Sequence, residues 1–265
     1  MPVGIDHIVI AVNNLDDTIA DYTAAGFTVT PGGEHKGGAS ANVLVTFQDG
    51  AYFELIAFKG EGGGAPGWRS TLEDAGEGLV DFAFRTNDLD AEVEVLKGNG
   101  IDVQGPYPGG RFRPDGQRID WRNIRLEHEG ASKLPFYCFD ETPRPLRVPD
   151  GEASIHANGV TGVAGLTIVV RNLEGSSAAY AAITGSEGEE ITVEGANGAR
   201  RFTAGPAAID LVEPAEGSAL ATYLEQRSEV PYEVALVTPT GTGELATGNT
   251  HGARLRLVTP SAVTA

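Results

Sequence analysis

One pattern occurs three times in this chain and limits its fold more than any other feature. Each copy is an apolar run of strand length that leads directly into a helix start, and the copies begin at Gly4, Gly78 and Gly162. The Asn or Asp that ends each run is a residue type that caps helices. Recurrence of one supersecondary unit indicates a modular fold. Only the first copy carries a histidine, at His7, where the second has Asp81.

The residues after the first copy predict what one module contains. Leu15, Ile19 and Tyr22 recur at helical spacing, and Gly26 then ends the helix. Three further strands are expected, at residues 27–30, 43–47 and 52–58. The last two are joined by Asp49-Gly50, a strong hairpin signal. The sequence therefore predicts a β-α-β-β-β module.

Two segments interrupt this pattern where a tight turn would suffice. One is the Gly-rich stretch 32–38, which contains His35, and the other is the polar stretch 105–117. Long irregular loops in compact domains are often functional. We therefore expect both segments to be loops that border a cleft.

Taken together, the repeats predict an α+β fold of tandem βαβββ modules arranged in two lobes. Residues 1–142 are expected to form a lobe from modules 1 and 2, and residues 158–265 a lobe from module 3 and a degenerate module 4 that starts with a helix capped by Ser218. The Pro-rich segment 143–157 is expected to be the linker. Paired modules should give each lobe a curved, mainly antiparallel sheet with a concave face, which is a natural ligand site.

Composition narrows the class of partner. The formal net charge is −18, which argues against nucleic acid or an anionic membrane surface, since both are bound mainly through Lys and Arg. No apolar run approaches the roughly 20 residues needed to cross a bilayer. The chain has one cysteine, Cys138, and opens without a signal-like segment. These features predict a cytoplasmic, acidic protein that binds a small molecule, and they leave a homodimer open.

Several short motifs carry a family resemblance that covers essentially the whole chain. They stand at residues 6–9 (DHIV), 32–35 (GGEH), 42–44 (NVL), 50–56 (GAYFELI), 109–116 (GGRFRPDG), 121–122 (WR), 134–136 (LPF), 142–144 (TPR) and 156–159 (HANG). With these motifs the chain resembles the vicinal oxygen chelate superfamily, which includes glyoxalases, extradiol dioxygenases and bleomycin-resistance proteins. Within it, the chain is most similar to the bacterial glyoxalase-like domain proteins.

The resemblance implies a divalent metal site in the first lobe. Superfamily metal ligands lie on the first and last strands of each paired module, and in module 1 these positions hold His7 and Glu54. The matching positions of module 2 hold Asp81 and, approximately, Phe136, which cannot bind a metal. His35 or Asp81 is then the candidate for a third ligand. The sequence does not distinguish Zn, Ni, Mn, Fe or Mg.

Other residues are candidates for substrate binding. Guanidinium groups suit bidentate recognition of carboxylate or phosphate. Trp121 could stack on a ligand, and His35 and Asn42 belong to the family-like motifs. An arginine cluster is the densest positive feature of this acidic chain and comprises Arg111, Arg113 and Arg122, to which Arg125 adds.

These observations favour a metal-dependent lyase or isomerase that acts on an oxygenated, and given the arginines anionic, metabolite. His7 and Glu54 are its expected catalytic residues, with Glu54 either a metal ligand or a general base. A non-catalytic protein that sequesters a small molecule is the alternative, and the missing ligands of module 2 favour it. Extradiol chemistry fits less well, because it requires a 2-His-1-carboxylate set and the first strand of module 2 has no histidine. A remnant in which the paired modules serve only assembly is a third hypothesis.

Overall fold

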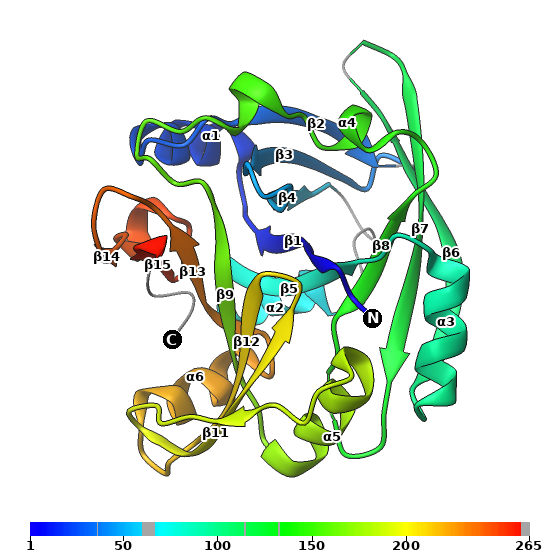
Figure 1. Ribbon diagram of the computed structural model, residues 1–265. Helices are drawn as coiled ribbons and strands as arrows, with labels where there is room; N and C mark the ends of the chain where they lie inside the picture. The colour runs from blue at the N-terminus through cyan, green and yellow to red at the C-terminus, as the bar shows by residue number, and fades with distance from the viewer. Residues whose placement is uncertain (36, 60–66, 114, 132, 261–265) are drawn as a thin grey trace.

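The structure, a computed structural model, describes residues 1–35, 37–59, 67–113, 115–131 and 133–260 and contains two sheets (Figure 1). The first is a closed barrel in the order β1-β4-β3-β2-β6-β7-β8-β5, and the second is a seven-stranded sheet in the order β10-β11-β12-β9-β13-β15-β14. One hydrophobic core contains side chains of both sheets, among them Phe53, Leu166 and Val234. The sheets therefore pack as one body, and the lobe limits at residues 142 and 158 stay a prediction.

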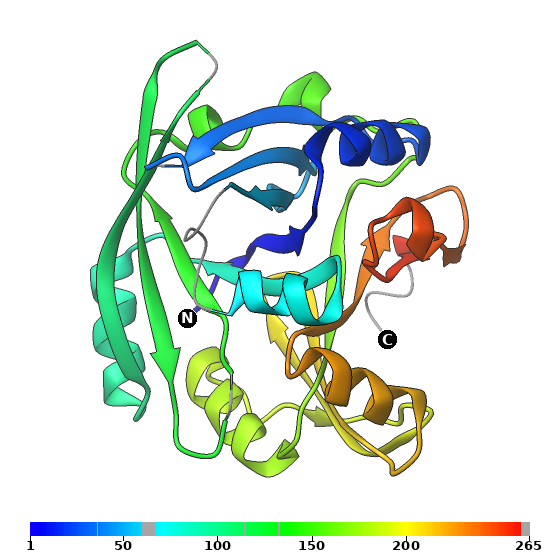
Figure 2. The same cartoon turned by 180° about the vertical axis from the view of Figure 1, so that it is seen from behind.

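The barrel is made by modules 1 and 2. Module 1 consists of β1 (Gly4–Ala11), α1 (Leu15–Ala24), β2 (Thr30–His35), β3 (Ser40–Thr46) and β4 (Tyr52–Phe58). Module 2 consists of β5 (Gly78–Arg85), α3 (Leu89–Gly98), β6 (Asp102–Phe112), β7 (Arg118–Glu127) and β8 (Phe136–Asp140). The helix α2 (Trp68–Ala75) precedes β5 and lies beside the second sheet's α6 (Figure 2). Both modules thus have the predicted order.

The second sheet repeats this plan without closing. Its strands are β9 (Gly162–Val169), β10 (Glu189–Glu190), β11 (Ala196–Ala204), β12 (Ala207–Pro214), β13 (Pro231–Val237), β14 (Gly243–Glu244) and β15 (Leu255–Val258). The helix α5 (Leu173–Thr184) follows β9, and α6 (Ala219–Arg227) follows β12. The strand β13 pairs antiparallel with β9 and parallel with β15, as β5 pairs with β1 and β8. The fourth module therefore begins at β13. The helix α6 precedes it as α2 precedes β5, which corrects the prediction that this helix belongs to the module.

The three predicted repeat starts are the first residues of β1, β5 and β9. The predicted caps also hold: Asn14 accepts hydrogen bonds from Asp16 N and Asp17 N, and the Ser218 hydroxyl accepts one from Ala221 N. These features are local in sequence, since a cap and its helix are adjacent. This explains why the pattern alone located them.

Both segments expected to be loops are mainly strands. Residues 32–35 lie in β2, and residues 105–112 lie in β6, which pairs with β7. Glycine is needed at positions 32 and 109 because a side chain of the neighbouring strand lies against the backbone there. A Cβ at Gly109 would lie 2.1 Å from Nε1 of Trp121, and a Cβ at Gly32 would lie 1.9 Å from Oδ1 of Asn42. Here glycine marks a close approach of a side chain to a strand, not a loop.

The segment 143–157 is ordered against the barrel. It contains α4 (Arg144–Arg147) and the 3-10 turn η1 (Gly151–Ser154). After η1, the ring of His156 accepts a hydrogen bond from Thr28 N at 3.0 Å and lies 3.0 Å from the carbonyl oxygen of Thr46. The segment thereby ties the chain between the two sheets to β3 and to the start of β2.

Candidate functional site

A cavity of about 990 Å³ opens into the barrel, and its size is near the upper end for ligand pockets. Most of its wall is formed by β1, β3, β4, β6, β7 and β8, with α2 on one side. Ser228, Glu229 and Val230, which follow α6, close part of it. The second lobe therefore contributes to the wall of the first lobe's cavity.

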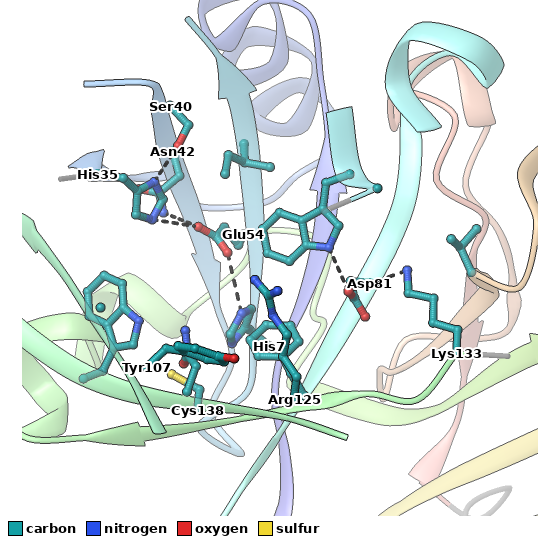
Figure 3. A pocket seen from close by; sticks show the side chains of 18 of the residues that line it. His7, His35, Ser40, Asn42, Glu54, Asp81, Tyr107, Arg125, Lys133 and Cys138 are labelled. Atoms are coloured by element: carbon teal, nitrogen blue, oxygen red, sulfur yellow. Dashed lines mark hydrogen bonds and ion pairs between the residues drawn. The ribbon is translucent and has the colours of Figure 1, made fainter. Parts of the chain in front are cut away.

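Three predicted residues meet on one carboxylate at one end of this cavity (Figure 3). Nε2 of His7 lies 3.6 Å from Oε2 of Glu54, and Nε2 of His35 lies 3.4 Å from Oε1 of the same side chain. The amide of Asn42 donates a hydrogen bond of 2.6 Å to Oε1. His7 and Glu54 are 4% and 5% exposed, and the side chain of His35 is 23% exposed, so the carboxylate and one of the two imidazoles are buried in the cavity wall.

Strand geometry explains this convergence. The strands β1 and β4 are parallel neighbours with Val9 opposite Glu54, so His7, two residues earlier on the same face, lies beside it. His35 arrives from the end of β2, across β3, and its Nδ1 lies 3.0 Å from the hydroxyl of Ser40. Burial lowers the pKa of His35; nearby Arg111 and His7 add to this, and Glu54 opposes it. His35 is therefore a neutral imidazole at pH 7.

His7 is fixed in orientation. Its ring stacks on Tyr52 at a centroid distance of 4.9 Å and meets the edge of Phe136 at 5.3 Å. Its Nδ1 lies 2.7 Å from Oδ1 of Asp6. An ionised carboxylate only accepts hydrogen bonds, so we assign the proton to Nδ1. The lone pair on Nε2 then points toward Glu54 and the cavity.

A buried charge cluster holds Asp6 itself. Asp6 is fully buried; burial alone would raise its pKa, but Arg147 and Arg144, with His7, hold the pKa well below its usual value. Arg147 donates to both carboxylate oxygens of Asp6 at 3.0 Å and to the Tyr52 hydroxyl at 2.6 Å. Both arginines also pair with Asp140. Asp6 and Arg144 stand in family-like motifs, but no local pattern could pair them, because the members of the cluster lie up to 141 residues apart.

Asp81 lies further along the cavity and is occupied by other partners. The indole of Trp68 donates to its Oδ2 at 2.7 Å, and Nζ of Lys133 lies 3.6 Å from the same oxygen (Figure 3). Asp81 and Phe136 are the counterparts of His7 and Glu54 in module 2. Ala83, two residues after Asp81, pairs with Phe136, just as Val9, two residues after His7, pairs with Glu54. The module 2 half of a symmetric site therefore holds a bonded carboxylate and a phenyl ring.

The structure separates the predicted arginines. Arg111 is buried, lines the cavity near Glu54 and donates to the carbonyl oxygen of Arg147 at 3.0 Å. Neither Arg113 nor Arg122 lines it; Arg113 pairs with Asp115, and Arg122 with Asp90 and Glu141. Arg125 does line it. The alternation of β7 accounts for the difference, since odd-numbered side chains from Trp121 to Glu127 face the cavity and Arg122 does not.

Trp121 lines the cavity and lies edge-on to His35, with 6.1 Å between ring centroids. Sequence reasoning missed Trp68 and Lys133 as lining residues, and no local signal marked them. It also missed Tyr52, although this residue stands in the same motif as Glu54. Strand alternation from Glu54 could have placed Tyr52 on the cavity face.

The donor set fits a divalent metal ion. Two donors that share an ion at about 2.0–2.2 Å lie roughly 3–3.5 Å apart, close to the two distances from Glu54 to the imidazole nitrogens. These distances are too long for good hydrogen bonds, and the proton assigned to Nδ1 of His7 leaves the lone pair of its Nε2 facing the carboxylate. A cation would remove this repulsion. The ion would lie against His7, Glu54 and His35, with Asp6 as the hydrogen-bonded partner behind His7. The set is two histidines and one carboxylate, and its second histidine comes from β2 and not from the first strand of module 2.

A more compact group does not fit. Among the described residues, Asp6, His7 and Cys138 are the set of three whose donor atoms all lie within 4.8 Å of one another. Two arginines already occupy the Asp6 carboxylate, and burial raises the pKa of the Cys138 thiol. A third positive charge beside two guanidinium groups would be repelled. The donors that remain free to face a ligand are those around Glu54.

Comparison with known proteins identifies the family. The model of the glyoxalase-like domain matches residues 5–184, so the chain belongs to this family, within the vicinal oxygen chelate superfamily. No curated protein matches the sequence.

Solved structures share the fold over the whole chain. A hypothetical protein from Staphylococcus aureus matches with a TM-score of 0.71 and 13% identity, over 97% of this chain and 99% of that one. A mutant of 4-hydroxymandelate synthase from Streptomyces coelicolor matches with a TM-score of 0.62 and 12% identity, over 98% and 93%. At these identities the likeness establishes the α+β fold of paired modules. In the described residues no helix is long and apolar enough to span a membrane.

Proposed function

We propose that the chain is a glyoxalase-like enzyme in which His7, Glu54 and His35 hold a divalent metal ion beside an oxygenated small molecule. The observation that carries the proposal is the approach of two imidazole Nε2 atoms to one buried carboxylate, at 3.6 and 3.4 Å. When bound, such an ion would polarise a carbonyl or hydroxyl oxygen of the substrate.

The chain's own residues supply the remaining elements of a lyase or isomerase. Asn42 donates to Oε1 of Glu54 and so fixes the carboxylate, which would serve as a metal ligand or, in its alternative role, as the base that accepts a proton from a carbon next to a carbonyl. Asp6 and Tyr52 hold His7 in one tautomer and one orientation. His7 and Glu54 are buried in the wall of the barrel, which strengthens the electrostatic contact between them.

A titration with metal tests the proposal. Protein stripped with a chelator would be titrated with Mn²⁺ or Zn²⁺ by calorimetry, in parallel with His7→Ala, Glu54→Gln, His35→Ala and Asp81→Asn. We expect one site, with affinity reduced at least about 10-fold in the first three variants, since each removes one donor. Asp81→Asn should bind as the wild type does. Equal affinity in Glu54→Gln and the wild type would refute the proposal.

A second function, sequestration without turnover, is favoured by one observation. Phe136 and Asp81, which is hydrogen-bonded to Trp68, occupy the positions that would complete a symmetric metal site. This half of the cavity can therefore contact a small molecule but is not equipped to bind a metal ion. Turnover separates the two functions. A binding protein would retain a captured compound unchanged when incubated with metal, whereas an enzyme would convert it.

A further inference from the structure

We infer that Arg125 is the anchor for an oxyanion, a carboxylate or phosphate, on the molecule that fills the cavity. Arg125 lies on β7 and lines the cavity with the residues around Glu54. Figure 3 shows its side chain directed into the cavity, between the His7–Glu54 end and the Asp81–Lys133 end. The inference deepens the proposed function by naming a class of substrate. It rests on the proposed function only for the statement that the reacting part of the substrate lies at the metal ligands.

Arg113, Arg118 and Arg122 each pair with a carboxylate, and Arg125 differs from them. Within the described ranges no carboxylate or carbonyl oxygen pairs with its guanidinium; its contact is with the ring face of Tyr107, 5.5 Å from the centroid. The chain has 37 Asp and Glu against 19 Lys and Arg, so a cation can find an internal partner easily. An arginine that faces a cavity without one is available to an external anion.

The other arginines that line the cavity are engaged with acceptors of the protein. Arg147 is 3% exposed and donates to Asp6, Asp140 and Tyr52. Arg111 is 4% exposed and is held by a backbone carbonyl. Neither can turn to a ligand without leaving a buried acceptor unpaired, which costs roughly 1–3 kcal/mol or more. Arg125 is exposed and has no such cost.

Lys133 and several aromatic side chains line the cavity together with Arg125 and would surround a bound anion. Lys133 already donates to the carbonyl oxygen of Val80 at 2.6 Å and lies 3.6 Å from Asp81, yet it is 32% exposed and lines the same cavity. Aromatic side chains flank the path to the metal ligands, among them Tyr107, Trp68 and Phe136. A planar organic acid, with its acid group at Arg125 and its ring among these side chains, matches this wall in charge and in shape.

Calorimetry on metal-free protein tests the anchor independently of metal binding. The probes are benzoate, its neutral isostere benzamide, and inorganic phosphate. The control variant is Arg118→Gln, because Arg118 lies on the same strand but outside the cavity and pairs with Asp120. Since these titrations contain no metal, a failure of the metal proposal would leave their outcome unaffected.

We expect benzoate to bind at least about 10-fold more tightly than benzamide, and Arg125→Gln to remove this difference while leaving benzamide binding unchanged. Arg118→Gln should behave as the wild type does. Tighter, Arg125-dependent binding of phosphate than of benzoate would support the anchor and identify a phosphate ester as the ligand. Equal affinities for benzoate and benzamide, or unchanged benzoate binding in Arg125→Gln, would overturn the inference.

Discussion

Replacement of Arg147 by Met is expected to destabilise the fold strongly, because it removes the main partner of a fully buried carboxylate. Arg147 makes two hydrogen bonds of 3.0 Å to Asp6, one of 2.6 Å to Tyr52 and further bonds to Asp140. Removal of one partner of a buried ion pair costs about 3–5 kcal/mol. Arg144 still pairs with Asp6 at 2.5 Å in the variant, so we expect the lower value, about 3 kcal/mol.

The free energy of unfolding, measured by urea titration, checks this value. Arg256→Met is the control, because Arg256 is 43% exposed and its ion pair with Glu233 should contribute only about 0–1 kcal/mol. The double variant with Asp6→Asn should recover at least about 1 kcal/mol, since residue 6 then carries no buried charge that Arg144 alone must stabilise. A loss in Arg147→Met no larger than that in Arg256→Met would refute the reasoning.

Two further predictions concern packing and pH. Gly32→Ala should lower the free energy of unfolding by about 1–3 kcal/mol and weaken metal binding, because the new Cβ would lie 1.9 Å from Oδ1 of Asn42 and displace Asn42 from Glu54. The control for urea titration and metal titration is Gly98→Ala, whose Cβ would have no atom within 4 Å. Burial lowers the pKa of His156, partly offset by its hydrogen bond to Thr46, so the unfolded chain takes up the proton first. The free energy of unfolding should therefore fall as the pH drops below about 6.5, and this fall should be smaller in His156→Gln. Equal slopes of the urea midpoint against pH in the wild type and in His156→Gln would contradict this prediction.

The sequence predicted what adjacent residues determine. The apolar runs located β1, β5 and β9 at their first residues, and the run from Tyr52 to Phe58 is β4. Prediction from the sequence failed where the surroundings of a residue depend on a strand that is distant in the sequence. Gly109 looked like part of a loop because glycine favours turns, yet its role is to leave space for Trp121 on β7.

The candidate site shows the same limit. The family motifs pointed to His7, Glu54 and His35, and the structure brings these three together. Proximity in sequence was a poor guide to the arginines, because alternation along β7 directs Arg122 away from the cavity and Arg125 into it. The support behind His7 comes from α4, more than 130 residues later, and no local pattern could have revealed it.

The most direct test of the account is the metal content of the protein itself. Elemental analysis would compare wild type and Glu54→Gln, both purified without an affinity tag or added metal, with thermal melting as a control for folding. We expect close to one equivalent of a divalent transition metal in the wild type and its loss in Glu54→Gln, with a cooperative melting transition retained in both proteins. A metal content that is the same in both proteins would contradict it.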